Sequence, residues 1–167
     1  MSNRLLTLVT MASIATVLAC DSSTSTNDPT YATSLAGSKE NPAVTSSGSG
    51  TFTATINSSN IMTYSLSFTG LSSNSTGAHI HGPATATQNI GVLVNFAALP
   101  SGGTATTPLT LGATSGATAG TLNLATAINT TVSGDSLRKL LDLGLLYANV
   151  HTTTNGGGEI RGQIAKQ

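Results

Sequence analysis

Short runs in which apolar and polar residues alternate dominate the chain beyond residue 30. The clearest case is residues 51–56 and 62–68, which place large apolar side chains at every second position on either side of a turn at 57–60. Because successive side chains of a strand point to opposite faces, this pattern predicts a β-hairpin with one buried face. The same pattern predicts further strands at 31–35, around 79–81, at 92–96, 120–124, 147–152 and 159–164.

One segment follows a helical pattern instead. Within residues 133–144, three leucines stand at i, i+3 and i+4, Asp135 is the predicted N-cap and Gly144 the predicted stop. Residues 98–119 are rich in Gly, Thr, Ser and Ala and predict an exposed loop with one edge strand. Charged residues make up only 7% of the chain and aromatic residues 4%; it is instead rich in Thr, Ser, Gly and Ala with scattered Val, Ile and Leu, which favours many short strands with small-residue turns over a helical bundle. The expected fold is therefore an all-β antiparallel sandwich with one short helix.

The first twenty residues have the features of a targeting segment. Arg4 precedes an uncharged apolar run at 5–19, which is too short for a comfortable membrane span and ends at Cys20, the only cysteine of the chain. This arrangement resembles a bacterial lipoprotein signal peptide, in which the cysteine becomes the lipidated first residue. The alternative is an ordinary secretory signal with an incidental cysteine. We expect lipidation of Cys20, because the only cysteine of the chain falls at the cleavage point. The several acyl chains that this implies would anchor the protein lastingly.

The predicted domain organisation follows from this segment. Residues 1–19 are the signal peptide, residues 20–30 a polar, flexible tether, and residues 31–167 a single folded domain. The expected location is the extracytoplasmic side of a bacterial cell envelope, with the lipid bilayer as a partner through Cys20. The sequence leaves open whether the inner or the outer membrane holds it.

All 3 histidines lie in two of the predicted strands. His79 and His81 share one strand face, and Tyr147, Asn149 and His151 share a face of the second strand, because side chains alternate. The residues between them are apolar and are expected to face the core.

The glycine-rich linker 153–158 predicts a hairpin that joins the second histidine strand to the strand 159–164. In the expected pairing Glu159 faces His151 and Arg161 faces Asn149. These polar side chains would then share one surface of the sheet.

If the first histidine strand lies beside this hairpin, His79, His81 and His151 converge, with Glu159 near them. Three imidazoles with a carboxylate are a ligand set suited to zinc or copper. The alternative is that the imidazoles hydrogen-bond to loop carbonyls and pair with Glu159 on a solvated sheet face. Both interpretations stay open at this point, and Asn149, Arg161 and Tyr147 belong to the surrounding polar face in either.

The pattern as a whole resembles the CHRD domain, named for chordin and found also in many bacterial secreted proteins. The resemblance extends from Tyr31 to about Ala165, and Ala43 departs from it where the family often has proline. The matching residues are Leu35, Gly37, Glu40, Pro42, Gly50, residues 78–83 (AHIHGP), Gly144, residues 147–152 (YANVHT) and residues 158–163 (GEIRGQ).

This resemblance implies an immunoglobulin-like β-sandwich with limited similarity to copper/zinc superoxide dismutases. Those enzymes use strand histidines as copper ligands, but 3 histidines are too few for a bridged two-metal site of that kind. Fold similarity alone does not carry a function. The glutamate of the turn 37–42, Glu40, is expected to be a solvated surface carboxylate.

Composition narrows the functional classes. The formal net charge is +0 and there is no basic cluster, which argues against nucleic-acid binding. No hydrolase, P-loop or dinucleotide motif occurs in a usable context. We therefore expect a membrane-anchored binding or structural module without defined catalytic activity, which recognises a protein or an envelope component. The alternative is a mononuclear copper or zinc protein using His79, His81 and His151, with metal storage or dismutase-like redox chemistry.

Overall fold

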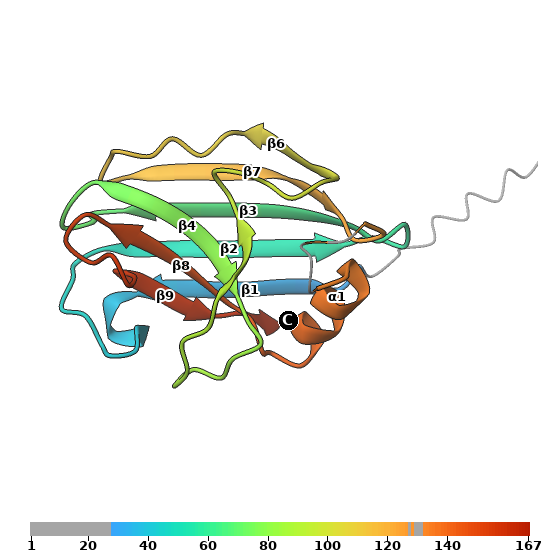
Figure 1. Cartoon of the computed structure of the whole chain (residues 1–167), viewed down its shortest axis with the longest axis horizontal. Coiled ribbons are helices and arrows are strands. Elements are labelled where there is room, and N and C mark those ends of the chain that lie inside the picture. Colours follow the sequence, from blue (N-terminus) through green and yellow to red (C-terminus); the bar gives the residue numbers. More distant parts are fainter. Residues whose placement is uncertain (1–27, 127, 129–131) are drawn as a thin grey trace, which may run out of the picture.

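The computed structural model of the chain describes residues 28–126, 128 and 132–167. Ten strands in this part form one antiparallel sheet in the order β5-β4-β8-β9-β1-β2-β3-β7-β6, with β10 beside β1 (Figure 1). In chain order the strands are β1 (Thr30–Ala36), β2 (Ser49–Ile56), β3 (Ile61–Thr69), β4 (Ser75–His81), β5 (Val92–Asn95), β6 (Gly103–Thr107), β7 (Gly116–Asn123), β8 (Tyr147–Thr152), β9 (Ile160–Gln163) and β10 (Ala165–Lys166).

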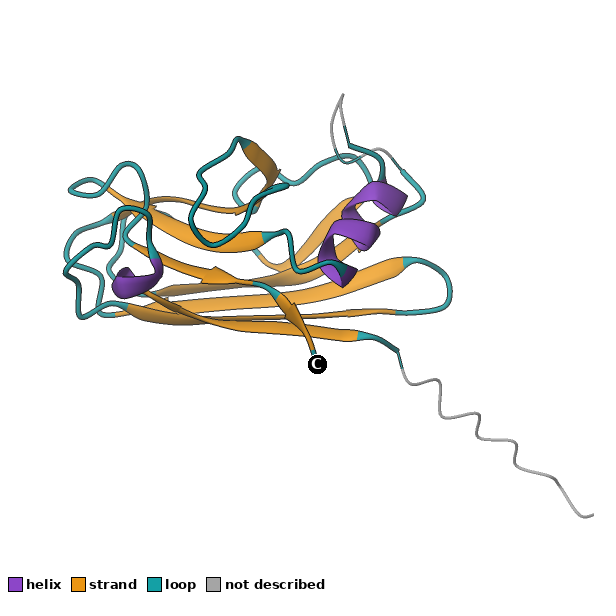
Figure 2. Cartoon of the chain, turned by 90° about the horizontal axis from the view of Figure 1, so that it is seen from below, coloured by secondary structure: helices purple, strands orange, loops and turns teal. Residues whose placement is uncertain are grey.

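The sheet curls over itself, so that β4 and β8 lie above the layer formed by β1, β2 and β3 (Figures 1 and 2). The core fills the space between the two layers. This arrangement confirms the predicted all-β, sandwich-like fold. The largest apolar side chains enclosed in the core include Tyr31, Leu35, Phe52, Ile56, Met62, Tyr64, Leu66, Ile80, Phe96, Leu122 and Ile160.

The β2–β3 hairpin has the predicted alternation and register. Phe52 pairs with Leu66 across the two strands, and both side chains are fully buried. Phe96, which follows β5 in the opposite layer, packs on this hairpin with its ring centroid 5.0 Å from that of Tyr64. The outer face of the hairpin carries mainly small hydroxyl residues, such as Thr53.

The predicted helix is present as α1 (Gly134–Asp142), and a single 3₁₀ turn, η1 (Gly37–Lys39), follows β1. The N-cap is Ser133, whose hydroxyl accepts a hydrogen bond from the backbone N–H of Ser136, so the prediction of Asp135 as N-cap was wrong by two positions. Ser133 can adopt the extended backbone of a cap, whereas Asp135 already lies in the first turn. Gly144 ends the segment with a φ of 66°, as expected for a left-handed C-terminal glycine.

The predicted signal peptide 1–19, Cys20 and most of the tether lie outside the described residues. Within the described residues, no helix has the length and apolar character needed to cross a lipid bilayer.

Candidate metal centre

The pairing of β4 with β8 brings the three histidines onto one face of the sheet. His79 stands directly opposite Asn149, and His151 stands opposite Gly77, so that His151 lies diagonally beside His79. His81 follows on the same face of β4. One ligand nitrogen from each of the three rings lies within 4.8 Å of the others. The predicted convergence of the histidines is therefore present.

One nitrogen of each ring is buried and lacks a hydrogen-bond partner: Nδ1 of His79 and Nε2 of His81 and His151. The opposite nitrogens of two rings are held by backbone carbonyls, Nδ1 of His81 by Ile90 O at 2.8 Å and Nδ1 of His151 by Gly156 O at 2.9 Å. Because a carbonyl oxygen only accepts, each Nδ1 carries the proton and each Nε2 keeps its lone pair. Both rings are thus fixed in the tautomer that a metal ligand requires.

The environment also keeps the imidazoles neutral. Burial, together with the neighbouring His151 and His81, lowers the pKa of His79 to about 4. Burial lowers the pKa of His81 and of His151 as well, although the carbonyls of Ile90 and Gly156 oppose this effect. Neutral imidazole is the form that binds metal ions.

A glycine makes room for the His79 ring. A Cβ atom at Gly77 would lie 2.8 Å from Cε1 of His79, closer than such atoms normally approach, and 3.1 Å from Nε2, which is a tight contact. The ring therefore rests against the bare backbone of Gly77, the residue that pairs with His151. A side chain at position 77 would separate the two histidines.

Tyr147 and Arg161 stack beside the ring of His81. The Tyr147 ring is parallel to that of His81, with an interplanar angle of 2° and centroids 4.9 Å apart. The guanidinium carbon of Arg161 lies 3.4 Å from the Tyr147 centroid, which is cation–π geometry. The predicted pairing of Asn149 with Arg161 is confirmed.

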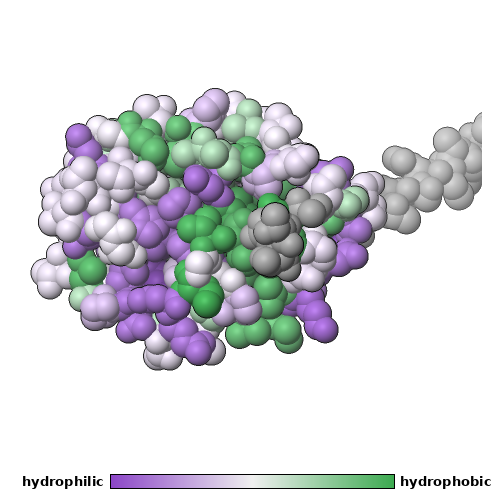
Figure 3. Space-filling view, in the orientation of Figure 1, coloured by the Kyte–Doolittle hydropathy of each residue, from purple (hydrophilic) through white to green (hydrophobic). Residues whose placement is uncertain are grey.

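Arg161 also fastens the loop that carries the carbonyl of Ile90. Its guanidinium is 1% exposed and donates to Asn89 Oδ1, to the Thr85 carbonyl and to the Gln88 carbonyl, at 2.8, 3.1 and 3.0 Å. Loops therefore cover part of the polar face, and His79 and His151 remain half-buried. The hydrogen bonds to loop carbonyls agree with the alternative interpretation, whereas Glu159 does not pair with the histidines as that interpretation expected. In the space-filling view, hydrophilic residues gather over the region of β8 and β9 (Figure 3).

Glu159 does not join the histidines, which corrects the expectation from the sequence. Its carboxylate accepts hydrogen bonds from the hydroxyl groups of Ser46, Ser72 and Thr152 at 2.6, 2.7 and 2.8 Å, and from the Ser72 backbone N–H. Thr152 follows His151 and points to the other face of β8, because side chains alternate. Burial alone would raise the pKa of Glu159, but these hydrogen bonds outweigh it and lower the pKa to about 2.

Glu40 is the residue near the centre whose role the sequence did not indicate. The expected solvated carboxylate is only 8% exposed, and its Oε1 is buried without a hydrogen-bond partner. Burial raises the pKa of Glu40 to about 7, although the positive charge of Arg161 and hydrogen bonding with the Asn149 side chain and the Asn41 backbone oppose the shift. Glu40 lines one surface depression with Thr87 and Arg161 and another with Pro42 and Asn89, residues that are mostly distant in sequence.

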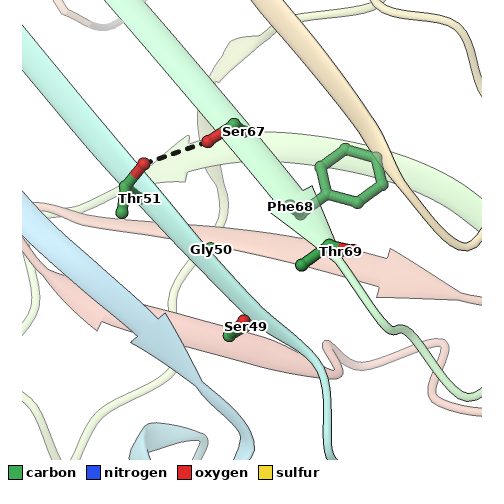
Figure 4. Close-up of a pocket in the computed structure, with 6 residues that line it drawn as sticks. All are labelled: Ser49, Gly50, Thr51, Ser67, Phe68 and Thr69. Atoms are coloured by element: carbon green, nitrogen blue, oxygen red, sulfur yellow. Dashed lines mark hydrogen bonds between the residues drawn. The ribbon is translucent and has the colours of Figure 1, made fainter.

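A separate surface depression of about 330 Å³ lies on the β2–β3 hairpin. It is lined by Ser49, Gly50, Thr51, Ser67, Phe68 and Thr69, with a hydrogen bond between Thr51 and Ser67 (Figure 4). None of these residues can titrate near neutral pH or ligate a transition metal strongly. The histidine cluster is therefore the stronger candidate site.

These features define an all-β module that carries a three-histidine cluster beneath its loops. The family model of the CHRD domain matches residues 31–164, and the chain belongs to this family. Membership supports a non-catalytic module of the extracellular type. No curated protein and no solved structure matches the chain significantly.

The hydrogen bonds of Glu159 predict a specific acid sensitivity. Because its folded pKa of about 2 lies below the ordinary 4.5, its contribution is complete above pH 4.5 and is lost as the pH falls towards 2. We expect Glu159→Gln to lower the free energy of unfolding by about 2–3 kcal/mol at pH 7. Urea denaturation from pH 7 to 2 should show this difference shrinking below pH 4.5.

Asp135→Asn is the matched control, since Asp135 is an exposed carboxylate on α1. It should change the unfolding free energy by less than about 0.5 kcal/mol. An equal effect of the two substitutions, or a difference for Glu159→Gln that is constant with pH, would contradict this role of Glu159.

Proposed function

We propose that this protein is a lipid-anchored extracytoplasmic module of a bacterial envelope that binds one copper or zinc ion through His79, His81 and His151. The observation that carries the metal proposal is the cluster of three rings in which one ligand nitrogen of each lies within 4.8 Å of the others, and in which each ring has one buried nitrogen without a hydrogen-bond partner. The backbone carbonyls that orient two of the rings support it. Family membership agrees with a binding module, and the features of the first twenty residues support the anchor.

A purely structural role accounts less well for these rings. A buried polar atom without a partner costs about 1–3 kcal/mol, and native proteins contain few of them. Here three such nitrogens belong to neighbouring rings and make no mutual hydrogen bond. One bound cation would satisfy all three lone pairs at once, whereas a hydrogen-bonded network would leave them unsatisfied.

The donor set also indicates which metals would bind. Imidazole nitrogens suit zinc and copper, whereas calcium and magnesium prefer oxygen ligands. Around zinc, with Zn–N distances of about 2.0–2.1 Å, ligand nitrogens lie about 3.4 Å apart. The present limit of 4.8 Å between nitrogens therefore requires small ring rotations to close the site. Hydrogen bonds from Nδ1 to backbone carbonyls are the usual support of a metal-binding histidine.

The first prediction concerns metal stoichiometry. The full chain, purified in detergent, loaded with copper or zinc and desalted, should retain about one equivalent by elemental analysis. His81→Ala removes a central ligand and should retain almost none, whereas Thr53→Ala, on the outer face of β2, should bind like the wild type. Wild-type protein that retains no metal, or a His81→Ala variant that retains a full equivalent of metal, would contradict the proposal.

The second prediction tests the space above Gly77. Gly77→Ala should weaken metal binding at least tenfold, because the new methyl group displaces the His79 ring towards solvent. The backbone at Gly77 is not left-handed, so thermal unfolding of the metal-free protein should change little. Competition with a chromophoric chelator gives the affinity.

Gly91→Ala is the matched control, because a Cβ atom there meets nothing within 4 Å although Gly91 follows Ile90 directly. Equal metal affinities for the two alanine variants would show that the position of His79 does not control binding.

The third prediction concerns the anchor. Cys20→Ser should move the protein from the membrane fraction to the soluble fraction and abolish labelling with radioactive palmitate, because the acylated sulfur is removed. Immunoblots of fractionated bacterial cells measure this. Membrane retention and labelling that survive the substitution would contradict anchorage through Cys20.

A further inference from the structure

Unpartnered polar atoms are concentrated around the histidines. Of the eight buried side-chain nitrogen or oxygen atoms without a hydrogen-bond partner in the described part of the chain, five belong to this region. Three are the ring nitrogens, and the other two are oxygens, Asn149 Oδ1 and Glu40 Oε1. A metal ion held by the rings accounts for the nitrogens alone. The two oxygens call for a group that donates hydrogen bonds.

Asn149 lies at the middle of the cluster. It pairs directly with His79 across the β4–β8 ladder and precedes His151 by two residues on the same face of β8. Its side chain is only 2% exposed. The amide oxygen is therefore enclosed beside the rings and accepts no hydrogen bond.

The Glu40 carboxyl group stands next to this amide. A Cβ atom at Gly158 would collide both with Glu40 Oε1 and with Asn149 Nδ2, the latter at 2.7 Å. The two side chains thus meet above the bare backbone of Gly158. Carboxylate and carboxylic acid alike keep an accepting oxygen, so Glu40 can receive a hydrogen bond in either protonation state.

We propose that Asn149 and Glu40 hold a water molecule at a fourth coordination position of the metal. This inference rests on the proposed three-histidine site and adds its fourth ligand. Three protein ligands plus one water is the arrangement of an open zinc site. A metal-bound water has two hydrogens to donate, and the structure offers two orphaned acceptors. Direct ligation by Asn149 Oδ1 would leave Glu40 Oε1 unpartnered.

This fourth position would be exchangeable, so small anions that replace water at copper and zinc, such as azide, would bind there. Because each histidine ligand is neutral, the bound ion keeps its full charge and attracts an anion. The two positioning residues would then govern how firmly water or an anion is held, without touching the metal themselves.

Pulsed electron paramagnetic resonance of the full chain loaded with copper(II) tests the inference. Exchange from H₂O into D₂O should reveal deuterons of one metal-bound water in the wild type. Asn149→Leu should keep one equivalent of copper, lose this deuteron signal and weaken copper binding about tenfold, as loss of an outer-shell partner does. Glu40→Leu should weaken the signal, whereas Glu40→Gln, which retains an accepting oxygen, should resemble the wild type.

The outcomes separate the two proposals. A wild-type protein that binds no copper overturns the three-histidine site and this inference together. Copper bound with no exchangeable water in the wild type, or with the same water signal in Asn149→Leu and Glu40→Leu, overturns the inference alone. Azide titration of the copper spectrum gives an independent readout: unchanged azide affinity in Asn149→Leu also counts against it.

Discussion

The antiparallel pairing of β4 with β8 is the constraint on which the site depends. Its register places His79 opposite Asn149 and Gly77 opposite His151, and a shift by one residue would turn the histidines into the core. The opposite faces of these strands carry Ala78 and other fully buried apolar residues, so core burial enforces the register. The alternation of side chains along β4 and β8 therefore places core residues on one face of these strands and the histidine cluster on the other.

Loops orient the histidine rings that the strands bring together. The carbonyls of Ile90 and Gly156 orient two rings, and the buried Arg161 holds the first of these loops in place. Arg161 also stacks on Tyr147, which lies parallel to the His81 ring. Burying a charged group is costly unless it is paired or hydrogen-bonded. The Arg161 guanidinium donates to the loop and interacts with the buried Glu40 carboxyl group. Arg161 therefore supports both this loop and the proposed metal site.

Sequence alone predicted those parts that local periodicity controls. The β2–β3 hairpin, the faces of the histidine strands and the pairing of Asn149 with Arg161 followed from alternation and a glycine-rich turn. The burial of Glu40 could not be predicted, because it depends on loops distant in sequence, and its turn composition is that of an exposed loop. Glu159 was misplaced because hairpin pairing begins only at Ile160, which lets its carboxylate turn towards Ser46, Ser72 and Thr152.

The central claim is that one metal ion lies among the three rings, and anomalous X-ray diffraction tests it most directly. Crystals grown with copper or zinc, measured at the absorption edge of that metal, should show one anomalous peak about 2.0–2.1 Å from His79 Nδ1 and from Nε2 of His81 and His151. A map without a peak between the rings, or with the metal held only by surface residues elsewhere, would contradict the account.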